Sequence, residues 1–163
     1  MNKAKLQSEP VEIHLMPGEF HFGGKNTRLH TVLGSCIAMT LWHPQLFIGG
    51  MNHCMLPSRG KPDNSSLDGH YADEAMKLIL HEVAKHHTRP AEYQVKLFGG
   101  GNMFQQTIEE KTFNVARNNI EAAQVLLKAN GFNIHVEHVG GSGHRIIIFD
   151  VRDGSVLVKY VKI

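Results

Sequence analysis

Two short apolar runs around a proline turn are the feature that most constrains the fold of this chain. The runs are IAMTLW, residues 37–42, and LFIGGM, residues 46–51, and they flank His43-Pro44-Gln45. Apolar runs of this length between turn residues are typical of β-strands, and proline favours the second position of a turn. The stretch therefore predicts a β-hairpin with its centre at Pro44 and Gln45.

The segments on either side of this hairpin predict a strand and a helix. VEIHLM, residues 11–16, alternates apolar and polar residues as a half-buried strand does. A loop rich in Pro, Gly, Ser, Asn and Asp follows the hairpin at residues 57–66. The helix after it has its N-cap region near Asp68 and ends by Arg89-Pro90. Its buried face is expected to hold Ala72, Ala75, Met76, Ile79, Leu80 and Val83.

The second half of the chain repeats the alternation of strand and helix. YQVKLFGGG, residues 93–101, predicts a strand that runs into a glycine loop. A second helix covers Val115–Ala129 and stops at Asn130-Gly131. Further strands are expected at residues 132–139, 145–151 and 155–163, the last two joined by a turn at Asp153-Gly154. This order predicts an α+β fold, with two main helices packed on mixed or antiparallel sheets.

The composition is that of a single soluble domain spanning residues 1–163. Apolar residues make up 42% of the chain, charged residues 20%, and the net charge is +2. The basic residues are scattered rather than gathered in a stripe, so no nucleic-acid partner is expected. No apolar stretch approaches the ~20 residues of a membrane span, and the N-terminus lacks a hydrophobic signal segment. We expect a cytoplasmic protein without direct membrane insertion, whose two cysteines are thiols.

Three other motifs do not predict a metal or a cofactor. HEVAKHH, residues 81–87, is similar to the H-E-x-x-H zinc helix but has Lys85 where the second histidine is required. FGGGN, residues 98–102, lacks the Lys-Ser/Thr of a phosphate loop and instead predicts close backbone approach along a groove. GGSGHR, residues 140–145, is interpreted as a structural turn in preference to a substrate contact. Its Arg145 is long enough to reach an acidic partner.

Cys36 follows the flexible dipeptide Gly34-Ser35, and the predicted hairpin places His53 directly opposite it. Directly opposed residues have Cβ atoms about 4.5–5.5 Å apart, so the imidazole can approach the thiol. A β-bulge at Gly49-Gly50 would break this pairing. An ion pair between thiolate and imidazolium would keep Cys36 alkylation fast below the ordinary thiol pKa of ~8.5.

A thiol beside an imidazole is the arrangement of a cysteine-dependent acyl-transfer site. The thiolate attacks an acyl or amide carbon, the histidine moves the protons, and backbone N–H groups of residues 34–36 can stabilise the oxyanion. A third group normally orients the histidine, and the nearby candidates are Thr31, Ser35 and His30. The alternative is a buried structural thiol, because free cysteine is among the most buried residue types. Cys54, next to His53, points to the opposite face and is interpreted as core packing.

The motifs around this pair resemble those of the CheD family, the chemoreceptor glutamine deamidases of bacterial chemotaxis. The similarity covers most of the chain. Its motifs are LGSC at Leu33–Cys36, HxMLP at His53–Pro57, K-x-FGG at Lys96–Gly100, RN at Arg117-Asn118 and GGSGHR at Gly140–Arg145.

The resemblance implies a function and a role for each site residue. It implies that Cys36 is the nucleophile, that His53 is its base, and that a threonine a few positions before the cysteine, here Thr31, is the third residue. The implied fold is a layered α/β sandwich. The implied substrates are glutamine side chains on the methylation helices of chemoreceptors, hydrolysed to glutamate through a cysteine thioester. Some members also hydrolyse glutamyl methyl esters, and some bind a CheC-type phosphatase.

Two other function classes remain compatible with the sequence. One is a non-catalytic chemotaxis adaptor that binds receptors or a CheC-type phosphatase. The other is a cysteine peptidase or transglutaminase, although no acceptor-amine site can be identified. Alanine at Cys36 separates the deamidase from the adaptor, because only a cysteine-dependent enzyme loses its activity with this substitution. Peptide fragments or amine-crosslinked products would reveal a peptidase or transglutaminase.

Overall fold

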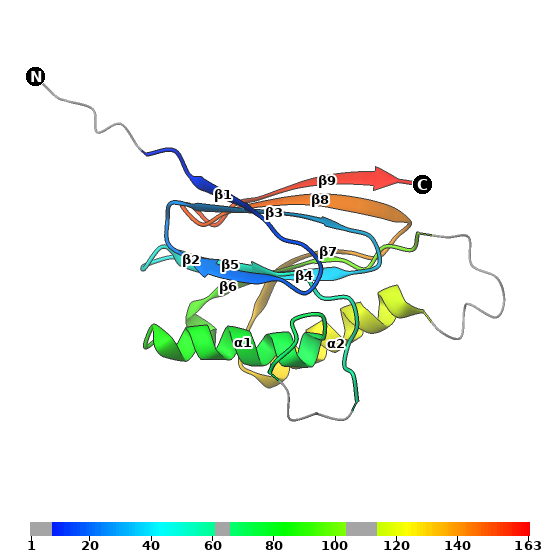
Figure 1. Ribbon diagram of the computed structural model, residues 1–163, viewed down its shortest axis with the longest axis horizontal. Coiled ribbons are helices and arrows are strands. Elements are labelled where there is room, and N and C mark those ends of the chain that lie inside the picture. The colour runs from blue at the N-terminus through cyan, green and yellow to red at the C-terminus, as the bar shows by residue number, and fades with distance from the viewer. Residues whose placement is uncertain (1–7, 61–65, 104–113) are drawn as a thin grey trace, which may run out of the picture.

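The computed structural model describes residues 8–60, 66–103 and 114–163, which form two β-sheets and a layer of helices. The first sheet has the order β1-β3-β8-β9 and the second the order β2-β5-β4-β6-β7. Figure 1 shows the first sheet stacked on the second, with both helices beneath the second sheet. In chain order the elements are β1 (Val11–His14), β2 (Phe20–Gly23), β3 (Thr27–Leu33), β4 (Ile37–His43), β5 (Ile48–Asn52), α1 (Ala72–Lys85), a 3-10 turn (Pro90–Glu92), β6 (Gln94–Gly99), α2 (Val115–Ala129), β7 (Ile134–Val139), β8 (Gly143–Asp150) and β9 (Val156–Lys162).

The α+β class and the element order predicted from the sequence are confirmed. Both sheets are mixed, since β1 is parallel to β3 and β7 is parallel to β6 while the other pairs are antiparallel. The second helix has the predicted bounds and the predicted stop, with Asn130 as its C-cap. The N-cap of α1 is Tyr71 rather than Asp68, because the Asp68 carboxylate accepts hydrogen bonds from His70 instead. Part of the predicted loop, residues 61–65, and the N-terminal residues 1–7 lie outside the described residues.

Sequence patterns did not predict β2 and β3. The inward face of β3 consists of Thr27, Leu29, Thr31 and Leu33, and its outward face includes Val32. Polar side chains inside and an apolar one outside weaken the alternation that identifies a strand. β2 is only four residues long and half-buried throughout, so it offers no clear pattern either.

The predicted hairpin exists, but its register differs from the expectation by two residues. Its turn spans four residues, and Ile37 pairs with Cys54, so Cys36 and His53 are not directly opposed. The two-residue turns that join strands need positive φ at a central position, which proline cannot adopt. The loop therefore lengthens, with Phe47 in the left-handed region at φ 52°. The ladder is continuous at Gly49-Gly50, without a bulge.

A shift by two residues preserves the face of the sheet on which each side chain lies. Cys36 and His53 each precede a member of the Ile37–Cys54 pair by one residue, so both lie on the face opposite to that pair. That face is the one between the two sheets, where Cys36 packs against an apolar cluster including Leu33 and Ala38. The diagonal arrangement thus keeps the thiol and the imidazole on a shared face.

Two apolar cores hold the three layers together. The first lies between the sheets and includes Leu29, Met51 and Phe149. The second lies between the second sheet and the helices and includes Met39 and Ile79. Strand β4 is almost completely buried because it contributes to both cores, which explains its continuous apolar run. Within the described residues, no helix is both long and apolar enough to cross a membrane.

Candidate active site

A hydrogen bond across the two sheets defines the candidate site. Thr31 lies on the inward face of β3 in the first sheet, and His53 follows β5 in the second sheet. Thr31 Oγ1 is 2.7 Å from His53 Nδ1, and both residues are buried. The sequence pattern nominated Thr31, Ser35 and His30 as partners of His53, and the structure brings Thr31 into contact with it.

This hydrogen bond determines which nitrogen of His53 carries the proton. The Thr31 hydroxyl donates its one proton to the backbone carbonyl of Leu15, at 3.0 Å. Its oxygen can then only accept from His53, so Nδ1 must carry the hydrogen. The other nitrogen, Nε2, is buried and has no hydrogen-bond partner within residues 8–60, 66–103 and 114–163. It is therefore an unoccupied proton acceptor on the face that also carries Cys36.

A turn of three glycines holds the backbone around Cys36. The N–H of Gly101 donates to the carbonyl of Gly34, and the N–H of Gly100 donates to the carbonyl of Cys36, both at 2.9 Å. Gly99 has φ 107°, and a Cβ there would collide with the Cys36 carbonyl oxygen. Only glycine fits such an approach. The close backbone approach predicted for residues 98–102 is confirmed at this turn.

Burial makes the free thiol and imidazole electrically neutral. It lowers the pKa of His53 to about 4, with the charge of nearby His70 as a second cause. It also raises the pKa of the Cys36 thiol above its ordinary value. At neutral pH both shifts favour the uncharged forms. The structure therefore favours a neutral thiol–imidazole pair over a resting ion pair, and proton transfer accompanies attack on a substrate.

Asn119 links the two chain segments that carry Cys36 and His53. It lies on α2, is 1% exposed, and its Nδ2 donates to the carbonyl of Ser35 at 3.0 Å and to that of Met55 at 2.9 Å. The Asn119 amide thus holds the backbone at Ser35, next to Cys36, and at Met55, two residues after His53. Sequence reasoning did not nominate Asn119, and the only signal was a polar residue at a buried position of the helix.

The other nominated residues lie elsewhere. His30 is on the outward face of β3, where it stacks on His14 at 4.4 Å between ring centroids and meets Glu12 at 3.3 Å. Alternation along the strand separates it from His53. Cys54 is fully buried in the core between the second sheet and the helices, as predicted, and burial raises its pKa to about 12.

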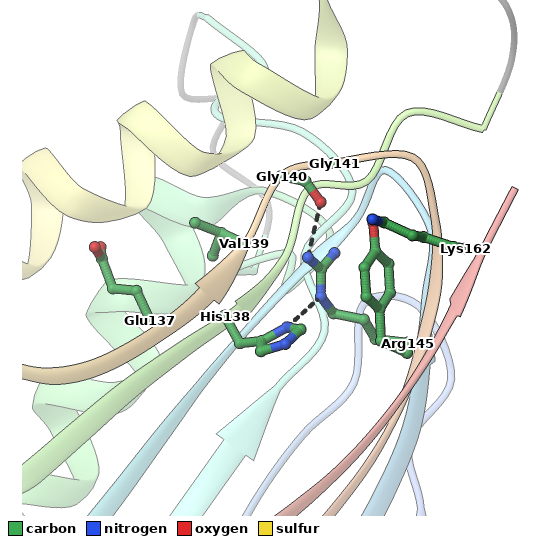
Figure 2. Close-up of a pocket in the computed structure, with 8 residues that line it drawn as sticks. Glu137, His138, Val139, Gly140, Gly141, Arg145 and Lys162 are labelled. Atoms are coloured by element: carbon green, nitrogen blue, oxygen red, sulfur yellow. Dashed lines mark hydrogen bonds between the residues drawn. The ribbon is translucent and has the colours of Figure 1, made fainter.

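Arg145, in the GGSGHR segment, has a buried structural position. Its guanidinium donates to the carbonyl of Gly99 at 3.2 Å. Figure 2 shows its two other hydrogen bonds, to the carbonyl of Gly140 at 2.7 Å and to His138 Nδ1 at 2.8 Å. It therefore braces the glycine turn that in turn contacts Cys36. Among the described residues, no cluster of three His, Cys, Asp or Glu side chains could hold a metal ion.

The family model and the curated relatives that match this chain belong to one family. A family model described as CheD chemotactic sensory transduction matches residues 55–160. A probable chemoreceptor glutamine deamidase CheD 3 of Dechloromonas aromatica is 50% identical over 153 residues, covering 94% of this chain and 89% of that protein. A probable chemoreceptor glutamine deamidase CheD of Pseudomonas syringae pv. tomato is 46% identical over 151 residues, covering 92% of this chain and 89% of that protein.

Among solved structures, the crystal structure of the Bacillus licheniformis hypothetical protein YfiH aligns with a TM-score of 0.49 and 12% identity, over 82% of this chain and 61% of that one. The family model begins after His53, whereas the two relatives match nearly the whole chain, including the segment with Thr31, Cys36 and His53. On the strength of the family model and of these relatives, the chain belongs to the CheD family.

Proposed function

We propose that the protein is a cysteine-dependent glutamine deamidase that converts glutamine side chains of chemoreceptors to glutamate. The observation that carries this proposal is the unoccupied His53 Nε2, buried on the same face as Cys36 and oriented by Thr31. The relatives are named as probable chemoreceptor glutamine deamidases, and their names suggest the substrate. We further propose that the protein docks on the methylation helices of the receptor, acts in the cytoplasm and has a CheC-type phosphatase as a regulatory partner.

The first half of the reaction forms a thioester. His53 Nε2 takes the proton of the Cys36 thiol as the sulfur attacks the carboxamide carbon. The resulting imidazolium keeps its Nδ1–H on Thr31 and gives its Nε2 proton to the amide nitrogen. The C–N bond then breaks, ammonia leaves, and the glutamyl group remains on the sulfur. A neutral thiol and a neutral imidazole suit this order of proton transfers, since neither group has to be charged before the substrate binds.

The oxyanion formed in this step needs hydrogen-bond donors near the sulfur. In a trans peptide the C=O and the following N–H point in opposite directions. The Gly34 carbonyl faces the glycine turn and the Ser35 carbonyl faces Asn119, so the N–H groups of Ser35 and Cys36 point away from those partners. We assign the oxyanion to these two N–H groups.

The second half hydrolyses the thioester. His53 Nε2, again neutral, accepts a proton from water, and the hydroxide attacks the thioester carbon. The C–S bond breaks, the thiolate regains the proton from the imidazolium, and glutamate is released. A glutamyl methyl ester follows the same path with methanol as the leaving group, so both substrates are compatible with the site.

The deciding experiment is incubation of a purified receptor cytoplasmic fragment with wild-type protein and with Cys36→Ala, followed by peptide mass analysis. The expected result is the small mass gain of amide-to-acid conversion at specific glutamines with the wild type, and none with the variant. Conversion by Cys36→Ala would show that another residue is the nucleophile. Binding of the receptor fragment or of a CheC-type phosphatase without any conversion would identify an adaptor, and shortened or amine-linked peptides would identify a peptidase or transglutaminase.

A further inference from the structure

The guanidinium of Arg145 is a buried cation that has no carboxylate among its hydrogen-bond partners in the described residues. The residue is 2% exposed, and its hydrogen-bond partners in the described part of the chain are one imidazole and two backbone carbonyls. The ring of Tyr160 stacks against it at 4.4 Å. A buried charge is ordinarily paired with an opposite charge, because the loss of hydration costs several kcal/mol per ion. Burial accordingly lowers the pKa of Arg145.

Arg145 lines a pocket of about 350 Å³, between the end of β7, the loop that follows it and strand β9. Glu137 is the acidic residue of its lining, but its carboxylate accepts a hydrogen bond from Gln124 at 2.9 Å. Figure 2 shows this carboxylate directed away from the guanidinium. The pocket is therefore lined by a cation that the nearby acid does not neutralise.

Two further groups give the pocket hydrogen-bond donors and positive charge. His138 Nδ1 accepts from Arg145, so its imidazole is neutral and carries its hydrogen on Nε2, which is left as a donor. Lys162 brings an ammonium group from β9, and its side chain extends toward the loop at Gly140 and Gly141 in Figure 2. Arginine, lysine and an imidazole N–H are the donors that recognise carboxylates.

The pocket lies next to the glycine turn of the candidate active site. The Gly99 carbonyl that accepts from Arg145 also accepts from the Gly140 N–H, and the next residue, Gly100, donates to the Cys36 carbonyl. Gly101, whose N–H donates to the Gly34 carbonyl, also lies beside the guanidinium, since a Cβ placed on Gly101 would be 3.5 Å from an Arg145 Nη atom. Only the glycine turn at residues 99–101 thus separates the Arg145 side of this pocket from the backbone of Cys36.

We propose that the pocket formed by Arg145, His138 and Lys162 binds a carboxylate, and that its occupant is an acidic side chain of the protein substrate close to the target glutamine. The assignment of the occupant rests on the proposed deamidase function, whereas the carboxylate site itself does not. Carboxylate binding in this pocket would determine which glutamines are selected, because it would place an amide with an acidic neighbour at Cys36 in preference to an isolated amide.

The carboxylate site is tested without any enzymatic assay. Sodium acetate is titrated into the protein at constant ionic strength, with sodium chloride as the reference, while the Arg145 Nε–H resonance is followed by NMR. A saturable acetate-specific shift is expected, with weaker binding in Lys162→Met and unchanged binding in Lys159→Met. Lys159 lies on the same strand but on the other face of the sheet, so Lys159→Met removes the same charge away from the pocket. Equal shifts with acetate and chloride, or equal effects of the two variants, would overturn the site.

The substrate assignment is tested by deamidation kinetics with the same variants. Removal of one solvent-accessible charge contact is expected to raise KM for a receptor fragment about threefold to fivefold in Lys162→Met, with kcat unchanged, and to leave Lys159→Met at the wild-type value. Unchanged KM in Lys162→Met would mean that the pocket takes a free carboxylate and not one of the substrate. A wild-type protein that converts no glutamine would instead refute the proposed function and leave the acetate titration to decide the site.

Discussion

Thr31 Oγ1 lies 2.7 Å from His53 Nδ1 and connects the first sheet to the second at the candidate site. The Thr31 proton is given to the Leu15 carbonyl, so the threonine acts on His53 only as an acceptor. A residue of one sheet therefore decides which nitrogen of a histidine on the other sheet can take a proton from Cys36.

Thr31→Val removes this acceptor while keeping the size of the side chain. We expect kcat for deamidation to fall about 100-fold with little change in KM, since an imidazole in the wrong tautomer cannot act as the base. Thr31→Ser should keep most of the activity. Thr27→Val, on the same inward face of the same strand, is the control. Equal kcat for the two valine variants would show that Thr31 does not orient His53.

The pH dependence of Cys36 alkylation reports the charge of the resting pair. Because burial raises the thiol pKa and lowers that of His53, labelling by iodoacetamide should be slow at pH 7. Its rate should rise with a midpoint above the ordinary thiol value of about 8.5. Mass mapping separates Cys36 from the fully buried Cys54. A rate already at its plateau near pH 6 would demonstrate a thiolate–imidazolium pair instead.

The depressed pKa of His53 also affects stability. The unfolded chain binds a proton at this residue near pH 6.5, but the folded protein does so only near pH 4. This contribution to stability is present above pH 6.5 and is lost as the pH falls toward 4, by about 3 kcal/mol in total. Denaturant unfolding of wild type and His53→Gln between pH 7 and pH 4 measures the difference. Parallel pH profiles would contradict the low pKa.

Asn119→Asp tests whether one amide aligns the thiol and the imidazole. The substitution keeps the shape but replaces the Nδ2 donor by a carboxylate oxygen that faces the carbonyls of Ser35 and Met55. Since small displacements of reacting groups reduce rates strongly, kcat should fall about 10- to 100-fold. Asn118→Asp, at an exposed position of the same helix, carries the same charge change. An Asn119→Asp enzyme as active as this control would show that the link has no catalytic effect.

Gly99→Ala tests the glycine turn that holds the Cys36 backbone. Gly99 has a positive φ, and an added methyl group would collide with the Cys36 carbonyl oxygen. We expect a loss of about 1–3 kcal/mol in the free energy of unfolding, together with loss of deamidation. Gly24→Ala, where the space around a Cβ is empty, should retain both properties. Chemical denaturation and the receptor-fragment assay measure them.

Local patterns in the sequence predicted the helices, the element order and the α+β class. The spacing of apolar residues predicted the buried face of α1, and the Asn130-Gly131 stop fixed the end of α2. These features depend on residues a few positions apart, which interact within one element. The face of the sheet carrying Cys36 and His53 was predicted as well, even though the register was wrong by two residues, because side-chain direction in a strand repeats every two residues.

The tertiary structure decided which of these residues meet. Thr31 and His30 are adjacent in the sequence, five and six positions before Cys36, but only Thr31 lies on the inward face that contacts the other sheet. Asn119 contacts Ser35 and Met55, which precede it in the chain by 84 and 64 positions. No local sequence pattern encodes contacts over such separations. The sequence by itself thus predicted the helices, the strands other than β2 and β3, and the thiol and imidazole of the site, whereas the stacking of the two sheets decided which residue orients the imidazole.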